Sequence, residues 1–426
     1  MNVRRTAAAL AASAVLGALA APAASAGTAA PSASPKLPAG LHGDKDPTYD
    51  AVWRQSIALL AQDTAGVTPS AEAVDWLTGQ QCDSGAFAAY RADASAECDA
   101  KTPVDSNATA IAVQALAALG GHTGEVGKAV GWLKSVQNED GGWGYLPGTP
   151  SDTNSTSVVV GALAAAGEKP AKTRAGGKSP YDALTELQLG CDADSGDRGA
   201  YAFQPDEKGR LLANADATVA GVLAGHGKGL LADPAAGDGG EGGKGGGAPE
   251  PLECGSGAEA DRTPEEAASG AAAYLTALLE KDGHLTSLAP GADKPVPDHG
   301  NTAEAVIALA AAGHPEAAEA PLAWLEKNSA EWAADNPAGL GTLVLAAHAA
   351  GGDPRSFGGT DLVKQLNATG PEPESVRAAG ADTGEDGEKS GSGNVSALWW
   401  VLGAGVLAGL VIGAALLLAG ARKKRS

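Results

Sequence analysis

The sequence predicts an all-α fold in which about twelve helices form a closed (α/α)6 toroid, or barrel, around a common centre. Three observations support this fold class. Uncharged, alanine-rich segments alternate with amphipathic ones, both kinds recur roughly every 50 residues, and no segment shows strand-like alternation over a useful length. Only 4% of the residues are aromatic, so the apolar content consists mainly of small side chains that favour close helix packing. An open solenoid of helix pairs is the alternative architecture.

The uncharged segments predict the inner helices. They run from Asn107 to Gly120 and from Asn154 to Gly167, and similar segments begin at Asp216 and Asn301. Each begins with a residue type that favours the N-cap position and ends near a glycine. Because an apolar helix must be buried on most of its surface, we expect an inner series. Its members start near residues 48, 105, 152, 214, 299 and 337.

The amphipathic segments predict the outer helices. Examples are Ala73–Leu77, Ala129–Lys134, Tyr181–Leu184 and Pro321–Glu326, each with an apolar and a polar side. Their pattern suits helices that cover the inner series and face water on the other side. We expect them to start near residues 70, 126, 179, 263, 316 and 358.

The two ends of the chain predict export and anchoring. Residues 1–26 have a basic start, an apolar stretch and a small-residue cleavage site, which is typical of a secretory signal peptide; an uncleaved anchor is the alternative. Residues 27–45 are predicted to be a linker, and residues 368–396 an acidic stalk. Between them, residues 46–367 are predicted to form the toroid, with a flexible Gly-rich insertion at 233–260. Residues 397–420 are uncharged and long enough to span a bilayer, before a basic tail at 421–426.

This organisation predicts a single-pass cell-membrane protein with an extracellular domain and a cytoplasmic C-terminus. A degenerate sortase signal is the alternative to a retained span, because no L-P-x-T-G-like sequence precedes residue 397. The formal net charge of −21 argues against nucleic-acid binding, which needs a basic surface.

The four cysteines predict disulfides. An even number in an oxidising compartment makes disulfides the default, and the spacings fit no zinc site. Three pairings are possible. We favour Cys82–Cys98 and Cys191–Cys254, because each closes a loop after one helix.

One motif resembles a known repeat. Gln137–Trp143 reads Gln-Asn-Glu-Asp-Gly-Gly-Trp, and weaker copies begin at Gln81 and Gln188. The run matches the Q-x-x-D-G-x-W repeat of the squalene–hopene cyclase and protein prenyltransferase superfamily, whose members are α/α toroids. We expect the Gln to close a helix C-terminus, the Gly to permit the turn and the aromatic residue to pack beneath it.

The inner-helix starts are similar to those of the extracellular cobalamin carriers in the same superfamily. The resemblance implies that polar residues at these starts face a ligand, with a corrinoid as one candidate; capping alone is the alternative. Aromatic residues in the preceding loops are candidate walls, or else residues that only pack the repeats. The candidate ligand-binding residues are therefore Asp105, Asn107, Asp152, Asn154, Asn214 and Asp216, with Phe87, Trp143, Tyr145, Tyr201 and Phe203.

The residues that would carry catalysis in this superfamily are mostly missing. Asp192 and Asp194 form an incomplete D-x-D-D acid motif, and no histidine has metal-ligand spacing. We therefore expect no catalytic residue, no metal and no resident cofactor. The sequence predicts a surface-anchored protein that captures a corrinoid or another medium-sized hydrophobic molecule for a membrane transporter or cell-wall partner. An exported prenyltransferase or terpene-cyclase-like enzyme and an extracellular protein-interaction scaffold are the alternatives.

Overall fold

The structure is a computed structural model that describes residues 37–232, 247–254, 262–288 and 293–376. These residues form 13 α-helices, one short 3-10 helix (η1, Pro170–Lys172) and six two-residue strands. The prediction of an all-α fold is confirmed. The strands pair in three antiparallel ladders: β1 (Val67–Thr68) with β6 (Ser375–Val376), β2 (Phe87–Ala88) with β3 (Val104–Asp105), and β4 (Thr286–Ser287) with β5 (Val296–Pro297).

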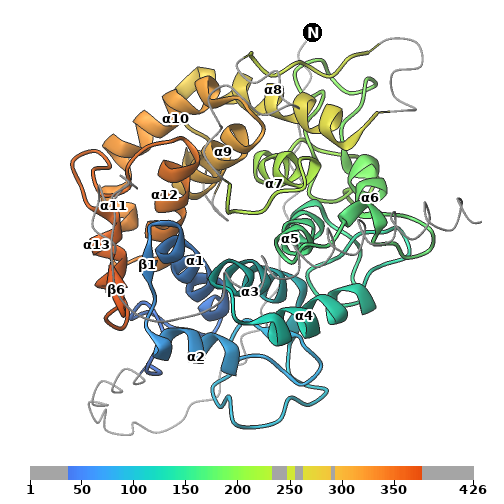
Figure 1. Ribbon diagram of the computed structural model, residues 1–426. Helices are drawn as coiled ribbons and strands as arrows, with labels where there is room; N and C mark the ends of the chain where they lie inside the picture. The colour runs from blue at the N-terminus through green and yellow to red at the C-terminus, as the bar shows by residue number, and fades with distance from the viewer. Residues whose placement is uncertain (1–36, 233–246, 255–261, 289–292, 377–426) are drawn as a thin grey trace, which may run out of the picture. The chain divides into compact units, whose positions relative to one another are not determined.

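Six helices of residues 37–376 form an inner ring. Each packs against the next one in the series, and the last returns to contact the first (Figure 1). Their observed starts lie close to the six predicted for the inner series. The ring consists of α1 (Ala51–Thr64), α3 (Ser106–Leu119), α5 (Thr153–Ala165), α7 (Ala215–Gly225), α9 (His299–Ala311) and α12 (Pro337–Ala349).

A second set of helices covers the ring from outside, each packed on the inner helix beside it. The four-residue helix α11 (Ala330–Ala333) lies between two members of the two series along the chain. The outer helices are α2 (Ala71–Gly79), α4 (Thr123–Ser135), α6 (Pro180–Leu187), α8 (Pro264–Asp282), α10 (Pro315–Asn328) and α13 (Leu362–Asn367).

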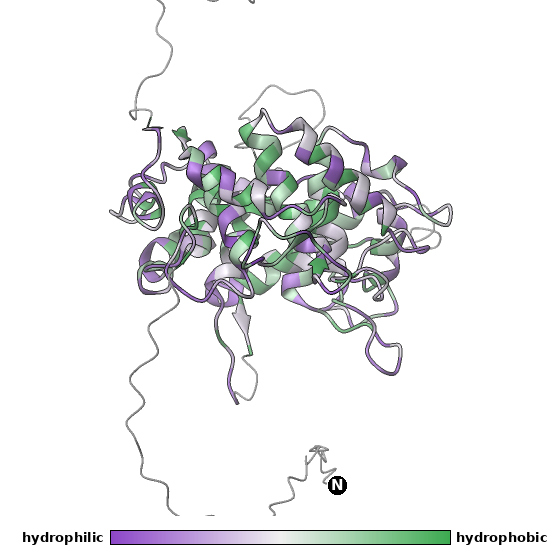
Figure 2. Cartoon of the chain, turned by 90° about the horizontal axis from the view of Figure 1, so that it is seen from below, coloured by the Kyte–Doolittle hydropathy of each residue, from purple (hydrophilic) through white to green (hydrophobic). Residues whose placement is uncertain are grey.

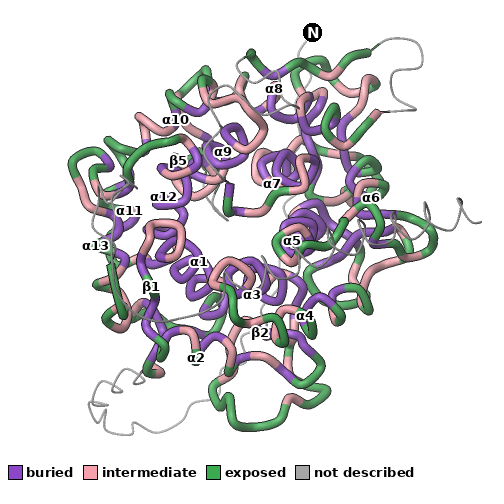
Figure 3. The backbone as a smooth tube through the Cα atoms, viewed as in Figure 1, coloured by how far each residue is buried: buried purple, intermediate pink, exposed green. Residues whose placement is uncertain are grey.

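The inner helices are buried because they carry small apolar side chains on almost every face (Figure 3). Glycine lets some of them approach closely. A Cβ atom on Gly341 of α12 would lie 2.6 Å from the Ile57 side chain of α1, and one on Gly221 of α7 would lie 2.4 Å from the Tyr201 ring. The alanine-rich composition is therefore a requirement of the packing distance between neighbouring helices.

The outer helices are amphipathic. Helix α4 buries Ala129, Val130 and Leu133 and leaves Lys134 at the surface, where it forms an ion pair with Glu168. Capping boxes begin two of these helices, α6 at Ser179 and α8 at Thr263. Hydrophobic residues accordingly concentrate on the helices, whereas the connecting loops are largely hydrophilic (Figure 2).

The repeated turn after an outer helix joins neighbouring repeats, which corrects the expected role of its glutamine. Gln137 does not cap its own helix: its Nε2 donates to the carbonyls of Gly141 (2.6 Å) and Thr173 (3.4 Å), the latter from the loop before α6. Gln81 and Gln188 make the same pair of bonds, to their own turn and to the first turn of α4 or α8. The expected glycine turn is present, since Gly141 has a φ of +90°.

The folded region begins before residue 46 and ends after residue 367. In the predicted linker 27–45, Leu41 and His42 are buried, and burial lowers the pKa of His42 to about 4. In the predicted stalk 368–396, Ser375 and Val376 pair with strand β1. The residues of both predicted segments that the structure describes therefore belong to the folded region, because they complete the packing around α1.

Both expected disulfides are present, Cys82–Cys98 and Cys191–Cys254, each with a Cα–Cα distance of 5.6 Å. The second anchors residues 247–254, which lie inside the predicted flexible insertion 233–260. Glu250 N also donates to Ser269 Oγ (3.2 Å) on α8. That part of the insertion is therefore fixed to an outer helix, while residues 233–246 and 255–261 lie outside the described residues.

The predicted signal peptide (1–26), membrane span (397–420) and basic tail (421–426) also lie outside the described residues. Among the helices that the structure describes, none has the length and apolar character needed to cross a bilayer.

Candidate ligand-binding site

Four of the inner helices, α3, α5, α7 and α9, share the same arrangement of a capping side chain at their start. Asp105, Asp152 and Asn214 accept a hydrogen bond from the backbone N–H three residues later, at 2.6, 2.7 and 2.9 Å. Asp298 caps α9 in the same way at 3.0 Å. The expectation that the inner series begins with caps at Asn107, Asn154, Asp216 and Asn301 is therefore wrong, because the caps lie two or three residues earlier.

A threonine four residues after each cap ties the helix to the preceding turn. Thr109 Oγ1 accepts from Phe87 N–H at 2.9 Å, and Thr156 Oγ1 accepts from Trp143 N–H at 3.0 Å. Thr218 with Tyr201 and Thr302 with Leu285 repeat this contact at 2.9 and 3.0 Å. The cap and the threonine together fix the backbone at which each inner helix begins.

The aromatic residues of these turns belong to the core. Phe87, Trp143 and Tyr201 are 0%, 1% and 2% exposed, and Trp143 Nε1 donates to the Leu133 carbonyl at 2.7 Å. Their expected role as walls of a binding site is not supported, because all three side chains lie in the hydrophobic core and none lines the central cavity described below. Tyr145 and Phe203 are 47% and 45% exposed, and neither lines the central cavity described below.

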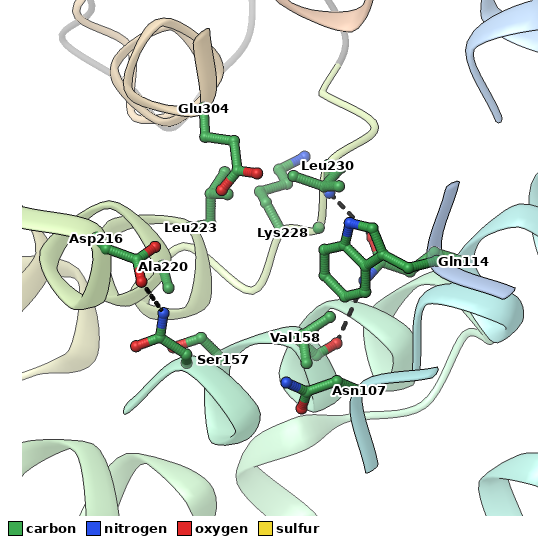
Figure 4. A pocket seen from close by; sticks show the side chains of 13 residues that line it. Asn107, Gln114, Ser157, Val158, Asp216, Ala220, Leu223, Lys228, Leu230 and Glu304 are labelled. Carbon is green, nitrogen blue, oxygen red and sulfur yellow. Dashed lines mark hydrogen bonds between the residues drawn. The ribbon is translucent and has the colours of Figure 1, made fainter. Parts of the chain in front are cut away.

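The residues two positions after the caps line a cavity inside the ring (Figure 4). Asn107 comes from α3, Asn154 from α5 and Asp216 from α7. Asn154 Nδ2 donates to Asp216 Oδ2 at 2.7 Å, so the first turns of two neighbouring helices are linked across the cavity wall. The structure thus divides the predicted polar residues into two sets: Asp105, Asp152 and Asn214 cap helices, and Asn107, Asn154 and Asp216 face the centre.

The cavity has a volume of about 160 Å³ and receives side chains from five of the six inner helices. Several residues that line the cavity were not predicted from the sequence. Glu304 could have been found, since it is the one acidic residue within the apolar helix α9. The others carried no comparable signal: Trp53 on α1, Gln114 on α3, Ser157 and Val158 on α5, Ala220 and Leu223 on α7, and the loop residues Lys228, Gly229 and Leu230.

The loop after α7 closes part of the cavity. Gln114 Oε1 accepts from Leu230 N–H at 2.9 Å, and its Nε2 donates to the Val158 carbonyl at 3.3 Å. Gly229 lies so close to this amide that a Cβ atom there would be 2.1 Å from Gln114 Oε1. The loop is therefore held against α3 and α5 by one buried glutamine.

Several polar atoms around the cavity have no hydrogen-bond partner among the described residues. They are Asn107 Oδ1, Asn154 Oδ1 and Ser157 Oγ. The Ser157 side chain belongs to a residue that is only 4% exposed. Buried polar atoms without a partner are costly and uncommon in folded proteins, so these atoms indicate a place where a ligand or water completes the bonding.

The carboxyl groups of the cavity lie in a poorly solvated environment. Desolvation, together with the charges of Asp216 and Asp298, raises the pKa of Glu304 to about 8. Burial likewise raises the pKa of Asp216, although the hydrogen bond from the Asn154 side-chain amide opposes this shift. In the part of the chain that the structure describes, no ion pair includes either carboxyl group.

The caps have a different electrostatic setting. Burial raises the pKa of Asp105 to about 6, but hydrogen bonds from the helix N–H groups and from Tyr145 favour its ionised form. Burial also raises the pKa of Asp152, against hydrogen bonds led by Ser155. These carboxylates have their partners in the helix itself, so their chemistry is structural.

Within the described residues, no group of three or more His, Cys, Asp or Glu side chains could hold a metal ion. The described residues thus form a closed ring of helices around a central cavity whose lining combines apolar side chains with amide and carboxyl groups. Neither the protein-family models nor the curated proteins include a match to this chain.

Proposed function

We propose that the protein binds one small organic molecule in the central cavity of an (α/α)6 toroid, as an extracellular, membrane-anchored binding protein. The observation that carries this proposal is the cavity itself, where unpartnered polar atoms meet side chains from five inner helices. Sites for small ligands combine an apolar lining with a few placed polar groups, as Trp53, Leu223 and Leu230 do here with the amides and carboxyls.

The cavity volume narrows the expected ligand. A cavity of roughly 150 Å³ accommodates one benzene molecule, and the central cavity is about 160 Å³. A corrinoid contains four five-membered rings in one macrocycle and is larger than this space. We therefore propose a ligand with about one ring. A corrinoid or longer isoprenoid would require the loop at 228–230 to leave its place against Gln114.

The proposed location rests on the sequence and on the disulfides. Two disulfides are typical of an oxidising compartment outside the cytoplasm. Residues 397–420 would hold the domain at the membrane, where a transporter or cell-wall protein would receive the ligand. Protease digestion of intact cells tests this topology: the region 37–376 should be cleaved from outside, and protection from external protease would contradict it.

The binding function is tested with a variant that fills the cavity. Ala220 lines it, so Ala220→Phe should abolish one-to-one binding of ring-sized ligands by the full chain in isothermal titration calorimetry. Ala118→Phe is the matched control, since Ala118 lies on the inner helix α3 but outside the cavity lining. Equal binding by both variants and the unchanged chain would contradict the proposal.

One observation favours an exported enzyme as a second candidate. With a pKa of about 8, Glu304 keeps its proton at neutral pH and is a suitable general acid. Such an enzyme would convert a small bound substrate, with the Glu304 proton passing to the departing atom of a leaving group. Mass spectrometry should then detect a product with the unchanged chain and none with Glu304→Gln.

A further inference from the structure

We propose that the ligand of the central cavity is an organic cation, a small ammonium ion. Its charge would lie between the carboxyl groups of Asp216 and Glu304, and its apolar body would contact Trp53. This inference rests on the proposed function and adds the chemical class of the ligand.

Two carboxyl groups line the cavity, and Lys228, the basic residue in the same lining, is solvent-exposed. Asp216 and Glu304 come from neighbouring helices, α7 and α9, toward the same space (Figure 4). Both side chains are only partly exposed to solvent, and a carboxylate with little access to water is stabilised by a neighbouring cation. No basic side chain forms an ion pair with either group in the described part of the chain. A ligand cation would supply the partner that the protein does not.

Polar oxygen atoms without a hydrogen-bond partner also lie around the cavity. Asn107 Oδ1, Asn154 Oδ1 and Ser157 Oγ have no partner there. Ser157 is more than nine-tenths buried and lines the same cavity. An ammonium group presents N–H donors and no acceptor, so it matches a wall in which oxygen atoms are left unbonded.

The lining of the cavity also indicates which kind of cation it would bind. The described residues contain no cluster of three side chains suited to a metal ion. Trp53 lines the cavity together with Val158, Leu223 and Leu230. An indole face attracts ammonium ions and apolar walls accept a hydrocarbon group, so the lining favours an organic cation over a hydrated metal ion.

Binding of a cation should depend on pH. The charged or titratable groups around Glu304 are Asp216 on α7, Asp298 at the start of α9 and Lys228 after α7. Lys228 is solvent-exposed at the cavity edge. Burial and the two neighbouring carboxylates keep Glu304 protonated, and therefore uncharged, at neutral pH. Ionisation adds a negative charge to the cavity, so a cation should bind more tightly to the ionised form. Affinity should therefore rise with pH until Glu304 is ionised, near pH 8.

The test compares three ligands of nearly equal shape: benzylammonium, benzyl alcohol and benzoate. The full chain, purified in mild detergent, is titrated by calorimetry at pH 6 and pH 8. At pH 8, benzylammonium should bind about tenfold more tightly than benzyl alcohol, as a charge-assisted bond implies, and benzoate most weakly. The preference should shrink at pH 6. Glu304→Gln should remove most of this preference for benzylammonium, whereas Ala118→Phe, outside the cavity lining, should leave it unchanged.

The outcomes separate the two proposals. If benzyl alcohol or benzoate binds as tightly as benzylammonium, and Ala220→Phe abolishes that binding, the site stands and the cation inference is overturned. Stabilisation of the chain by calcium or potassium chloride without benzylammonium binding would also overturn it. If none of the three ligands binds, or if Ala220→Phe leaves binding intact, the proposed function itself is overturned.

Discussion

Two sets of residues at the starts of the same inner helices have opposite environments. The first set, the caps and the turn aromatics Phe87, Trp143 and Tyr201, is largely buried and hydrogen-bonded within the protein: Asp152 caps α5, and Trp143 donates to the Leu133 carbonyl. The second set lies two residues further along, where Asn107, Asn154 and Asp216 face the central cavity. Two of its amide oxygens have no partner among the described residues.

This difference separates residues that build the ring from residues available to a ligand. A capping carboxylate gains its hydrogen bonds from the helix and contributes to stability. A polar side chain that faces a cavity without a complete set of partners costs stability, and binding is the usual compensation. Substitutions in the first set should therefore change the free energy of unfolding, and substitutions in the second should mainly change binding.

The largest effect is expected for Trp143→Ala. The substitution leaves a cavity between α4 and α5 and removes the bond to Leu133, so it should lower the free energy of unfolding by about 3–5 kcal/mol. Urea unfolding followed by circular dichroism measures it. Tyr145→Ala, two residues away at a side chain that is 47% exposed, is the control and should cost far less. Equal losses would remove the distinction between core and exposed aromatics.

The pH dependence of stability gives the next effect. Glu304 has a usual pKa of 4.5 and a folded pKa of about 8, so the folded state binds its proton more tightly than the unfolded state. The contribution of Glu304 to the free energy of unfolding is therefore largest below pH 4.5, and it is lost as the pH rises towards 8. The loss is on the order of 1 kcal/mol per pH unit.

Glu304→Gln removes this titration. Relative to the unchanged chain, the variant should gain stability between pH 6 and pH 8, because the amide never has to ionise. Urea titrations at both pH values provide the measurement. Parallel pH profiles for the two proteins would show that Glu304 is not held in its protonated form.

A smaller loss is expected for Asp152→Ala. Removing the cap of α5 should cost about 1 kcal/mol in the free energy of unfolding, since one helix N–H loses its acceptor. Asp152→Asn should restore most of the stability, because asparagine caps helices as well as aspartate does. If both substitutions left the unfolding midpoint unchanged, the contact would not contribute to stability.

The smallest effect is expected at the exposed aromatic Phe203. Its side chain is 45% exposed and lies outside the cavity lining, so Phe203→Ser should change stability by less than about 0.5 kcal/mol. It should not change the affinity for benzylammonium. A loss of affinity in calorimetry would place Phe203 in the binding site after all.

The sequence predicted the fold better than the site because fold information is local and repeated. Uncharged segments ending at glycine, such as Asn154–Gly167, have one stable environment, the interior between other helices. The two disulfide pairings were also predicted locally, because each closes a loop after one helix. Cys82–Cys98 and Cys191–Cys254 are both present. These features can be read from short segments without knowing how the ring closes.

The cavity could be predicted only in part. Asn107, Asn154 and Asp216 are candidate ligand-binding residues from their recurrence at helix starts, with capping alone as the alternative. Trp53 and Gln114 are not among the candidates, because nothing in their own segments shows which face of a wholly buried helix points to the centre. That direction depends on ring closure, where α1 meets α12 and the ends pair through Gln62 Nε2 and Asn367 Oδ1 at 2.8 Å.

One pair of variants tests the central distinction most directly, because both lie at the start of α5. Asn154→Ala and Asp152→Ala are compared in the full chain for benzylammonium affinity at pH 8 and for urea unfolding. The predicted result is a loss of affinity of about tenfold with little loss of stability for Asn154→Ala, and the reverse for Asp152→Ala. Unchanged affinity in Asn154→Ala, or equal effects of the two variants on both quantities, would contradict the account.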